Sequence, residues 1–233
     1  MRFCHNLFAT QTLAVSPQLQ QELEEQGIER VTLWQKAVSS TKFHPTHYSP
    51  TMRQRMIHGN NKQQVAVPRV GDKVLLAHSP VNEENDGFVV LYVGRFAHEK
   101  NLKLLKPIIS QLNTTANPKR KTKLCFVGTG PLRQELQEYF STDDCPVTFL
   151  GELHDEELSQ VFSSADVFVM PSKTETLGLV VLESMASGVP VVAANSGGIP
   201  YIIKNGTNSF LIDDADDDAA VEEKNISRNK TIC

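Results

Sequence analysis

From Phe88 onward, the chain repeats one pattern, in which a short apolar run is followed by a stretch with apolar residues at helical spacing. Four such pairs of a strand and a helix are predicted, over residues 88–93 with 102–112, 124–127 with 132–139, 147–150 with 156–162, and 167–170 with 179–185. Two more strands, 189–193 and 210–212, are expected to flank a short helix at 202–203. Near-continuous apolar strands that alternate with amphipathic helices are typical of parallel strands covered on both faces. The pattern therefore predicts an α/β fold with a doubly wound, Rossmann-like parallel sheet.

The first 58 residues carry a smaller version of this pattern. A strand is expected at 12–15, a helix that starts at Ser16-Pro17 and continues over 18–26, and a second strand at 31–34. These elements are too few to close a sheet of their own. Residues 59–86 read as a polar loop that we expect to be disordered, 87–212 as the main domain, and 213–233 as a polar tail.

Composition excludes several classes of protein. The 233 residues carry 23 Lys and Arg against 27 Asp and Glu, a net charge of −4, without the dense basic block of a duplex-binding protein. The four cysteines are scattered and show no C-x-x-C spacing, so we expect neither a disulfide framework nor a zinc site. The longest uncharged stretch, 184–203, is broken by Pro190 and Pro200, and the N-terminus lacks the pattern of a signal or transit peptide.

Two cations follow the first strand of the main domain. Arg95 comes directly after Gly94, and Lys100 is expected at the start of the next helix. Ligands of such sheets bind beyond the carboxyl ends of the strands. A guanidinium and an ammonium beside a helix N-terminus suit a diphosphate without a metal. The alternative is a surface arginine and a lysine that flanks a helix.

A glycine turn, Gly128-Thr129-Gly130-Pro131, follows the second of these strands. A dinucleotide fingerprint requires a third small residue where Arg133 stands, which disfavours an NAD-dependent enzyme. Two interpretations remain, a turn that lets a ligand approach the backbone and a purely structural tight turn.

Two glutamates bracket the start of the helix at 179–185. If all the residues from Glu175 to Glu183 were helical, the two carboxylates would stand about 12 Å apart at ~1.5 Å per residue. That separation exceeds the roughly 5–9.5 Å of a glycosidase pair, and suits the two ends of an elongated ligand. The alternative is a capping acid and an exposed helix acid. The pair His44 and His47 and the acidic run 213–218 lack the surroundings of a metal site, so no metal is expected.

Taken together, the Val93–Arg95 segment with Lys100, the turn at 127–132, and the segment from Met170 to Glu183 resemble the donor half of family-4 retaining glycosyltransferases of the GT-B fold. The segments 175–183 and 197–200 are most similar to the sulfoquinovosyltransferase branch, which makes sulfolipid from UDP-sulfoquinovose and diacylglycerol. The resemblance runs from about Leu13 to Ile212 and includes the inter-domain segment of those enzymes, so residues 1–58 are identified as a remnant of the acceptor-side domain with that segment.

The resemblance implies a role for each matching position. Arg95 and Lys100 would hold the donor diphosphate, Glu175 would contact the donor sugar, and Glu183 would bind the ribose. The remaining donor-binding positions implied are Gly94, Gly128, Gly130, Leu153, Thr176, Leu177, Gly178 and Leu179. No cofactor or metal is implied, and retention would proceed on one face of the sugar with the diphosphate assisting the incoming hydroxyl.

Departures from the family pattern limit this expectation. The family has a complete first Rossmann domain before the segment that begins here near Leu7, so we interpret the chain as N-terminally truncated and expect donor binding rather than turnover. Open alternatives are a non-catalytic nucleotide-binding fragment and a glucosyl- or mannosyltransferase of the same family. The implied partners are a nucleotide-sugar and, for a full-length enzyme, a lipid such as diacylglycerol, with peripheral membrane contact in a plastid or cyanobacterium and no nucleic acid.

Overall fold

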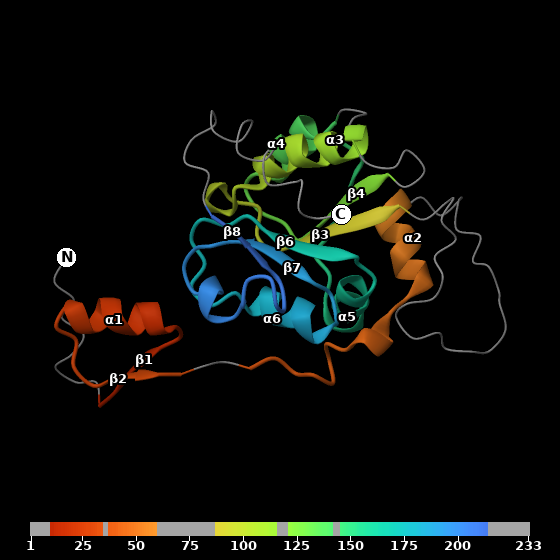
Figure 1. Ribbon diagram of the computed structural model, residues 1–233. Coiled ribbons are helices and arrows are strands. Elements are labelled where there is room, and N and C mark those ends of the chain that lie inside the picture. The colour runs from red at the N-terminus through yellow and green to blue at the C-terminus, as the bar shows by residue number, and fades with distance from the viewer. Residues whose placement is uncertain (1–9, 35–36, 60–86, 116–120, 142–144, 214–233) are drawn as a thin grey trace.

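A six-stranded parallel sheet forms the centre of the molecule (Figure 1). The computed structural model describes residues 10–34, 37–59, 87–115, 121–141 and 145–213. The strand order is β5-β4-β3-β6-β7-β8. The strands span Phe88–Val93 (β3), Thr122–Val127 (β4), Val147–Gly151 (β5), Val167–Met170 (β6), Val191–Ala194 (β7) and Phe210–Ile212 (β8). From β3 the chain builds outward to β5, then returns to add β6 on the other side of β3, so the winding reverses between β3 and β6.

Helices cover both faces of this sheet. Figure 1 shows α3 and α4 above it and α5 and α6 below it, which confirms the doubly wound α/β fold. The helices span Leu105–Thr115 (α3), Arg133–Tyr139 (α4), Asp155–Ser163 (α5) and Leu179–Ala186 (α6). Because all six strands run parallel, their carboxyl ends lie along one edge, where ligands of such sheets bind.

Three expectations about local structure were wrong. Lys100 does not begin a helix but closes a 3₁₀ turn, His98–Lys100, because Asn101 takes a left-handed conformation (φ 50°) and interrupts the helical path. The short helix expected at 202–203 is a 3₁₀ turn at Ile199–Tyr201. The strand expected from 189 begins at Val191, after Pro190, which has no N–H to donate to a neighbouring strand.

The core of the sheet is aromatic around β3 and β4. Tyr92, Phe96 and Phe126 contact one another with ring centroids 5.8–6.3 Å apart, and Phe126 stacks on Phe149 at 5.1 Å. Edge-to-face and offset-stacked rings add to the free energy of burial. This cluster lies directly beneath the loops that follow β3 and β4, so it supports the edge at which a ligand would bind.

A helix that the hydrophobic pattern did not predict, α2 (Pro50–His58), packs against α5. Ser49 accepts a hydrogen bond from the Met52 N–H and Pro50 occupies the first turn, which are ordinary start signals of a helix. Met52 and Met56 are buried in the same core as β3 and β4. The end of the 1–58 segment is therefore attached to the larger sheet.

The N-terminal residues form a separate βαβ unit. Strands β1 (Thr12–Ala14) and β2 (Val31–Leu33) pair in parallel, and α1 (Pro17–Glu25) connects them. Figure 1 shows this unit beside the larger sheet. Its assignment as a domain remnant stays a prediction. The expected disorder at 59–86 and the expected tail at 213–233 fall almost entirely on 60–86 and 214–233, which lie outside the described residues.

Candidate functional site

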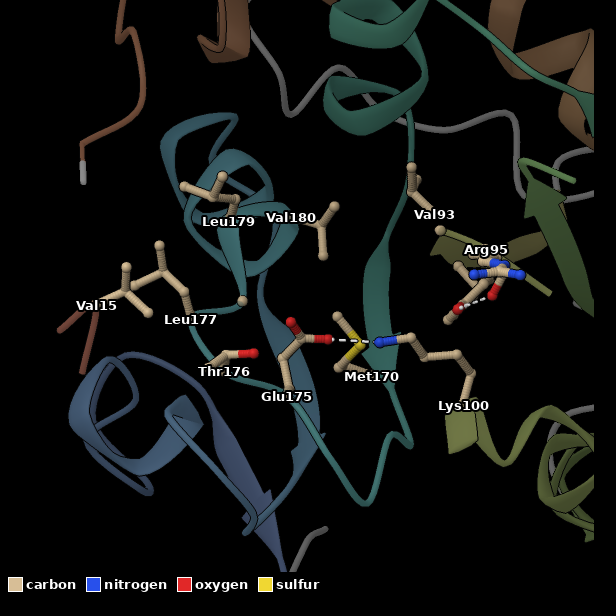
Figure 2. A pocket seen from close by; sticks show the side chains of 13 residues that line it. Val15, Val93, Arg95, Lys100, Met170, Glu175, Thr176, Leu177, Leu179 and Val180 are labelled. Atoms are coloured by element: carbon tan, nitrogen blue, oxygen red, sulfur yellow. Dashed lines mark hydrogen bonds and ion pairs between the residues drawn. The ribbon is translucent and has the colours of Figure 1, made fainter. Parts of the chain in front are cut away.

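A cavity of about 480 Å³ opens where the winding of the sheet reverses, beyond the carboxyl ends of β3 and β6. Figure 2 shows Arg95 and Lys100 at one side, Glu175 near the middle, and Val15, Leu177 and Leu179 at the other side. The size is that of a small-molecule site. The described lining residues are Val15, Tyr92, Val93, Gly94, Arg95, Lys100, Met170, Glu175, Thr176, Leu177, Gly178, Leu179 and Val180. Eight of the predicted site residues, from Gly94 to Leu179, therefore meet in one cavity.

Backbone contacts join the two loops that carry the charged residues. The Lys173 N–H donates to the Glu99 carbonyl oxygen at 3.3 Å, and the hydroxyl of fully buried Ser172 donates to the Thr174 carbonyl oxygen at 3.0 Å. The same hydroxyl also lies 3.3 Å from the Glu99 carbonyl oxygen. Because Glu99 precedes Lys100 and Thr174 precedes Glu175, these bonds hold Lys100 and Glu175 at a defined separation.

Lys100 and Glu175 form an ion pair inside the cavity. The Lys100 Nζ donates to the Glu175 Oε2 across 2.8 Å, and each side chain is 19% exposed. Figure 2 shows the two side chains pointing toward each other from opposite loops. Lys100, which was predicted to bind the diphosphate, and Glu175, which was predicted to bind the sugar, are thus direct partners. Their spacing along the chain did not indicate this contact.

Arg95 is exposed and lies on the same side of the cavity as Lys100. Its backbone is held by a buried side chain of the preceding strand. The hydroxyl of Tyr92, 1% exposed, donates to the Arg95 carbonyl oxygen at 3.0 Å. Burial raises the pKa of Tyr92, and the nearby carboxylates of Glu175 and Glu99 raise it further. The phenol therefore stays a neutral donor at physiological pH. Sequence reasoning missed Tyr92, although one polar tip in an otherwise apolar strand was an available signal.

Glycines shape the other side of the cavity. Gly178 is the N-cap of α6 in a left-handed conformation (φ 66°), without a side-chain cap, and Gly178, Leu179 and Val180 of this first turn line the cavity. A Cβ at Gly178 would collide with the Ile199 side chain. Gly197 and Gly198 lie against the backbone of Glu175 and Thr176, and a Cβ at either position would collide with a carbonyl oxygen there. The Gly197-Gly198 turn thus supports the Glu175 loop.

Four predicted donor-binding residues lie outside the lining of this cavity, namely Gly128, Gly130, Leu153 and Glu183. The structure favours the structural interpretation of the glycine turn, because side chains at Gly128 and Gly130 would collide with the backbone of Gly94 and Phe96. Leu153 is a core residue, 7% exposed. The loops themselves are neighbours, since the Gly94 N–H donates to the Val127 carbonyl oxygen and the Gly128 N–H to the Gly151 carbonyl oxygen.

Glu183 lies on the second turn of α6 and is partly buried. Burial raises the pKa of its carboxyl group, and the charge of Lys42 partly opposes this rise. The separation considered for a continuous helix from Glu175 to Glu183 does not apply, because the helix begins only at Leu179. Glu175 is on a loop and can approach Lys100 independently of the helix axis.

No three His, Cys, Asp or Glu side chains in the described part of the chain are grouped to hold a metal ion. Across the same residues, no helix has the length and apolar character needed to cross a bilayer. The described cysteines Cys125 and Cys145 are buried and are not joined in a disulfide.

Comparison with known proteins identifies relatives of this chain. Residues 77–226 match the model of the family "Glycosyl transferases group 1". Sulfoquinovosyl transferase SQD2 of Arabidopsis thaliana is 36% identical over 222 residues, which cover 93% of this chain and 37% of that protein. A GDP-mannose-dependent alpha-mannosyltransferase of Corynebacterium glutamicum is 30% identical over 212 residues, covering 91% of this chain and 42% of that protein. The chain thus spans well under half the length of these curated relatives.

Solved structures share the fold. The Anabaena protein HepE in complex with UDP and glucose superposes with a TM-score of 0.64 at 22% identity, over 89% of this chain and 50% of that one. Sucrose-phosphate synthase from Thermosynechococcus elongatus gives a TM-score of 0.61 at 25% identity, over 94% of this chain and 49% of that one. These neighbours are GT-B glycosyltransferases, so the fold inferred from the motifs is confirmed.

Proposed function

The chain belongs to the group 1 glycosyl transferases, and we propose that its main domain is the donor-binding half of a retaining enzyme that uses a UDP-sugar. One observation carries this proposal. Arg95, Lys100, Glu175 and the N-terminal turn of α6 converge on one cavity at the point where the sheet reverses its winding. Two cations beside the N-terminal turn of a helix suit a diphosphate, and a carboxylate beside them suits sugar hydroxyls.

The proposed chemistry needs no covalent nucleophile and no metal from this half. The bond between the anomeric carbon and the diphosphate oxygen breaks, and the acceptor hydroxyl oxygen bonds to that carbon on the same face. The diphosphate leaves with the electron pair of the broken bond and takes the proton of the acceptor hydroxyl. Arg95 and Lys100 would stabilise the negative charge that develops on the diphosphate, which is electrostatic catalysis by groups already in place.

The sugar and the acceptor are the finer part of the proposal. We propose sulfoquinovosyl transfer to diacylglycerol, in sulfolipid synthesis at a plastid or cyanobacterial membrane, because a sulfoquinovosyl transferase is 36% identical over nearly the whole chain. A GDP-mannose-using mannosyltransferase is the second candidate, supported by the 30% identity to such an enzyme. Because the chain spans only part of these relatives, turnover by this chain is itself a proposal, and a non-catalytic nucleotide-binding role is its alternative.

Titration with UDP, GDP, ADP and UDP-glucose tests the donor site. A ligand that binds the folded chain stabilises it by about 2.7 kcal/mol at a hundred times its Kd, so thermal unfolding and calorimetry should agree. A UDP-selective rise in Tm would support the UDP-sugar donor, and a GDP-selective rise would favour mannosyl transfer. A folded chain that responds to none of the four would contradict the proposal. Transfer of radiolabelled sugar to a lipid acceptor, lost in Arg95→Ala, would exclude the non-catalytic alternative.

A further inference from the structure

The ion pair between Lys100 and Glu175 changes what the cavity offers to a diphosphate. Among the described lining residues, the charged side chains are Arg95, Lys100 and Glu175, which sum to one net positive charge. Lys100 already has an anionic partner 2.8 Å away, in surroundings where both side chains are mostly withdrawn from solvent. An incoming phosphate therefore shares Lys100 with Glu175 and is also repelled by that carboxylate.

The charge of the ligand changes during sugar transfer. A nucleotide-sugar carries its diphosphate as a diester, whereas the released nucleoside diphosphate has a terminal phosphate whose second pKa is about 6. At neutral pH the product thus carries about one more negative charge than the donor. Two cations without a counter-ion would hold this product more tightly than the donor, and release would be slow.

We propose that Glu175 is the counter-ion that limits the affinity of the site for the nucleoside diphosphate product, so that this product leaves after transfer. The inference rests on the proposed function. With the donor bound, hydrogen bonds from sugar hydroxyls to the Glu175 carboxylate offset its repulsion of the diphosphate. With the product bound, the hydroxyls are gone and only repulsion and competition for Lys100 remain. Glu175 thereby favours donor over product at one site.

The test compares the affinities of the full chain and its variants for UDP and UDP-glucose by calorimetry, with GDP in a parallel series. E175Q keeps the shape of the side chain and removes its charge, so the Kd for UDP should fall by about five- to tenfold, as expected for one partly exposed charge beside the ligand. The Kd for UDP-glucose should fall less, because the amide is the weaker acceptor for sugar hydroxyls. E175A also removes the charge, and its effect on the Kd for UDP does not depend on how the glutamine amide of E175Q packs.

Two further variants assign the effect to the ion pair. In a K100M background, E175Q should lower the Kd for UDP by a smaller factor, because the competition for Lys100 is then absent and only the direct repulsion remains. E99Q is the matched control, since Glu99 is an exposed acid of the same loop, next to Lys100 in the chain. It should alter the Kd for UDP by less than about twofold.

The outcomes separate this inference from the proposed function. UDP binding of equal or lower strength in both E175Q and E175A overturns the counter-ion role and leaves the donor site standing. An equal gain in E99Q and E175Q also overturns it, because a general change in surface charge would then be the cause. If neither the wild-type chain nor any variant binds UDP or GDP while folded, the proposed function fails and the inference fails with it.

Discussion

The backbone N–H of Gly198 donates a hydrogen bond to the carbonyl oxygen of Glu175 across 2.7 Å. Through this bond the turn that follows β7 holds the loop that follows β6, and Glu175 projects from that loop toward Lys100. A backbone contact between two loops thus sets the position of the carboxylate. Glycine is required on the supporting side because there is no space for a Cβ between the two backbones.

Gly197→Ala should lower stability and reduce the preference of the site for UDP-glucose over UDP, whereas Gly206→Ala should lower stability alone. Both glycines have positive φ angles, +58° and +73°, so alanine costs about 1–2 kcal/mol of strain at either position. Only the alanine at 197 would also collide with the Glu175 carbonyl oxygen and displace that loop. Urea unfolding measures the stability, and calorimetry with UDP and UDP-glucose measures the preference. An equal ratio of the two Kd values in both variants would show that the Gly197 turn does not position Glu175.

Arg95→Ala should weaken UDP binding by about 1.5–3 kcal/mol, as expected for a hydrogen bond to a charged group. The Tm of the free protein should hardly change, because the Arg95 side chain is exposed. Arg133→Ala provides the control, since Arg133 is an exposed arginine at the start of α4 and outside the cavity lining. A similar loss of affinity in both variants would indicate a general effect of positive charge.

Glu183→Ala should weaken UDP binding by about 1–3 kcal/mol if the carboxylate accepts a hydrogen bond from the ribose. The structure places Glu183 outside the cavity lining. The variant therefore tests directly whether Glu183 binds the ribose, as the family resemblance implies. Calorimetry should be repeated with a UDP analogue that lacks the ribose hydroxyls, for which the wild type and Glu183→Ala should bind equally. An unchanged Kd for UDP itself would remove Glu183 from the donor site.

Glu183→Gln should change how stability depends on pH. Burial raises the pKa of Glu183 above its ordinary value of 4.5, so the folded chain binds this proton more tightly than the unfolded chain. Stability from this group is present below pH 4.5 and is lost as the pH rises through the folded-state pKa. The Tm of Glu183→Gln minus the Tm of the wild type should therefore increase as the pH rises from about 4 to 7. A difference in Tm that is constant with pH would contradict the raised pKa.

Arg53→Met should destabilise the chain by about 3–5 kcal/mol, because it removes the cation from a largely buried ion pair and the donor from two carbonyl oxygens. The Arg53 guanidinium, 5% exposed, donates to Asp166 at 2.7 Å and to the carbonyl oxygens of Ser164 and Gly87 at 2.8 Å. Arg55→Met, on the same helix, removes a more exposed pair with Glu157 and should cost about 0–1 kcal/mol. Denaturant unfolding measures the free energy of unfolding of both variants. Similar decreases in the two would show that the Arg53 pair contributes no more to stability than the exposed Arg55 pair.

The sheet and its helices were predictable because their signals are local. An apolar run marks a buried strand and helical spacing marks a covering helix within a few residues of each other, whatever the rest of the chain does. The strands at 88–93, 167–170 and 210–212 were correct to the residue. The helix α2 was missed because its weakly apolar sequence carries only start signals, and its burial depends on contact with α5.

The sequence indicated several of the residues that line the cavity, but not their arrangement. Residue types after the strands indicated Arg95, Lys100 and Glu175 separately, since the carboxyl ends of parallel strands share one edge. Only the strand order makes β3 and β6 neighbours and so brings together two side chains that lie 75 residues apart in the chain. Hydrophobic periodicity is a short-range property and contains no information on which strands adjoin. The sequence by itself therefore determined the elements and the candidate ligands, while the tertiary structure decided that Lys100 and Glu175 are partners.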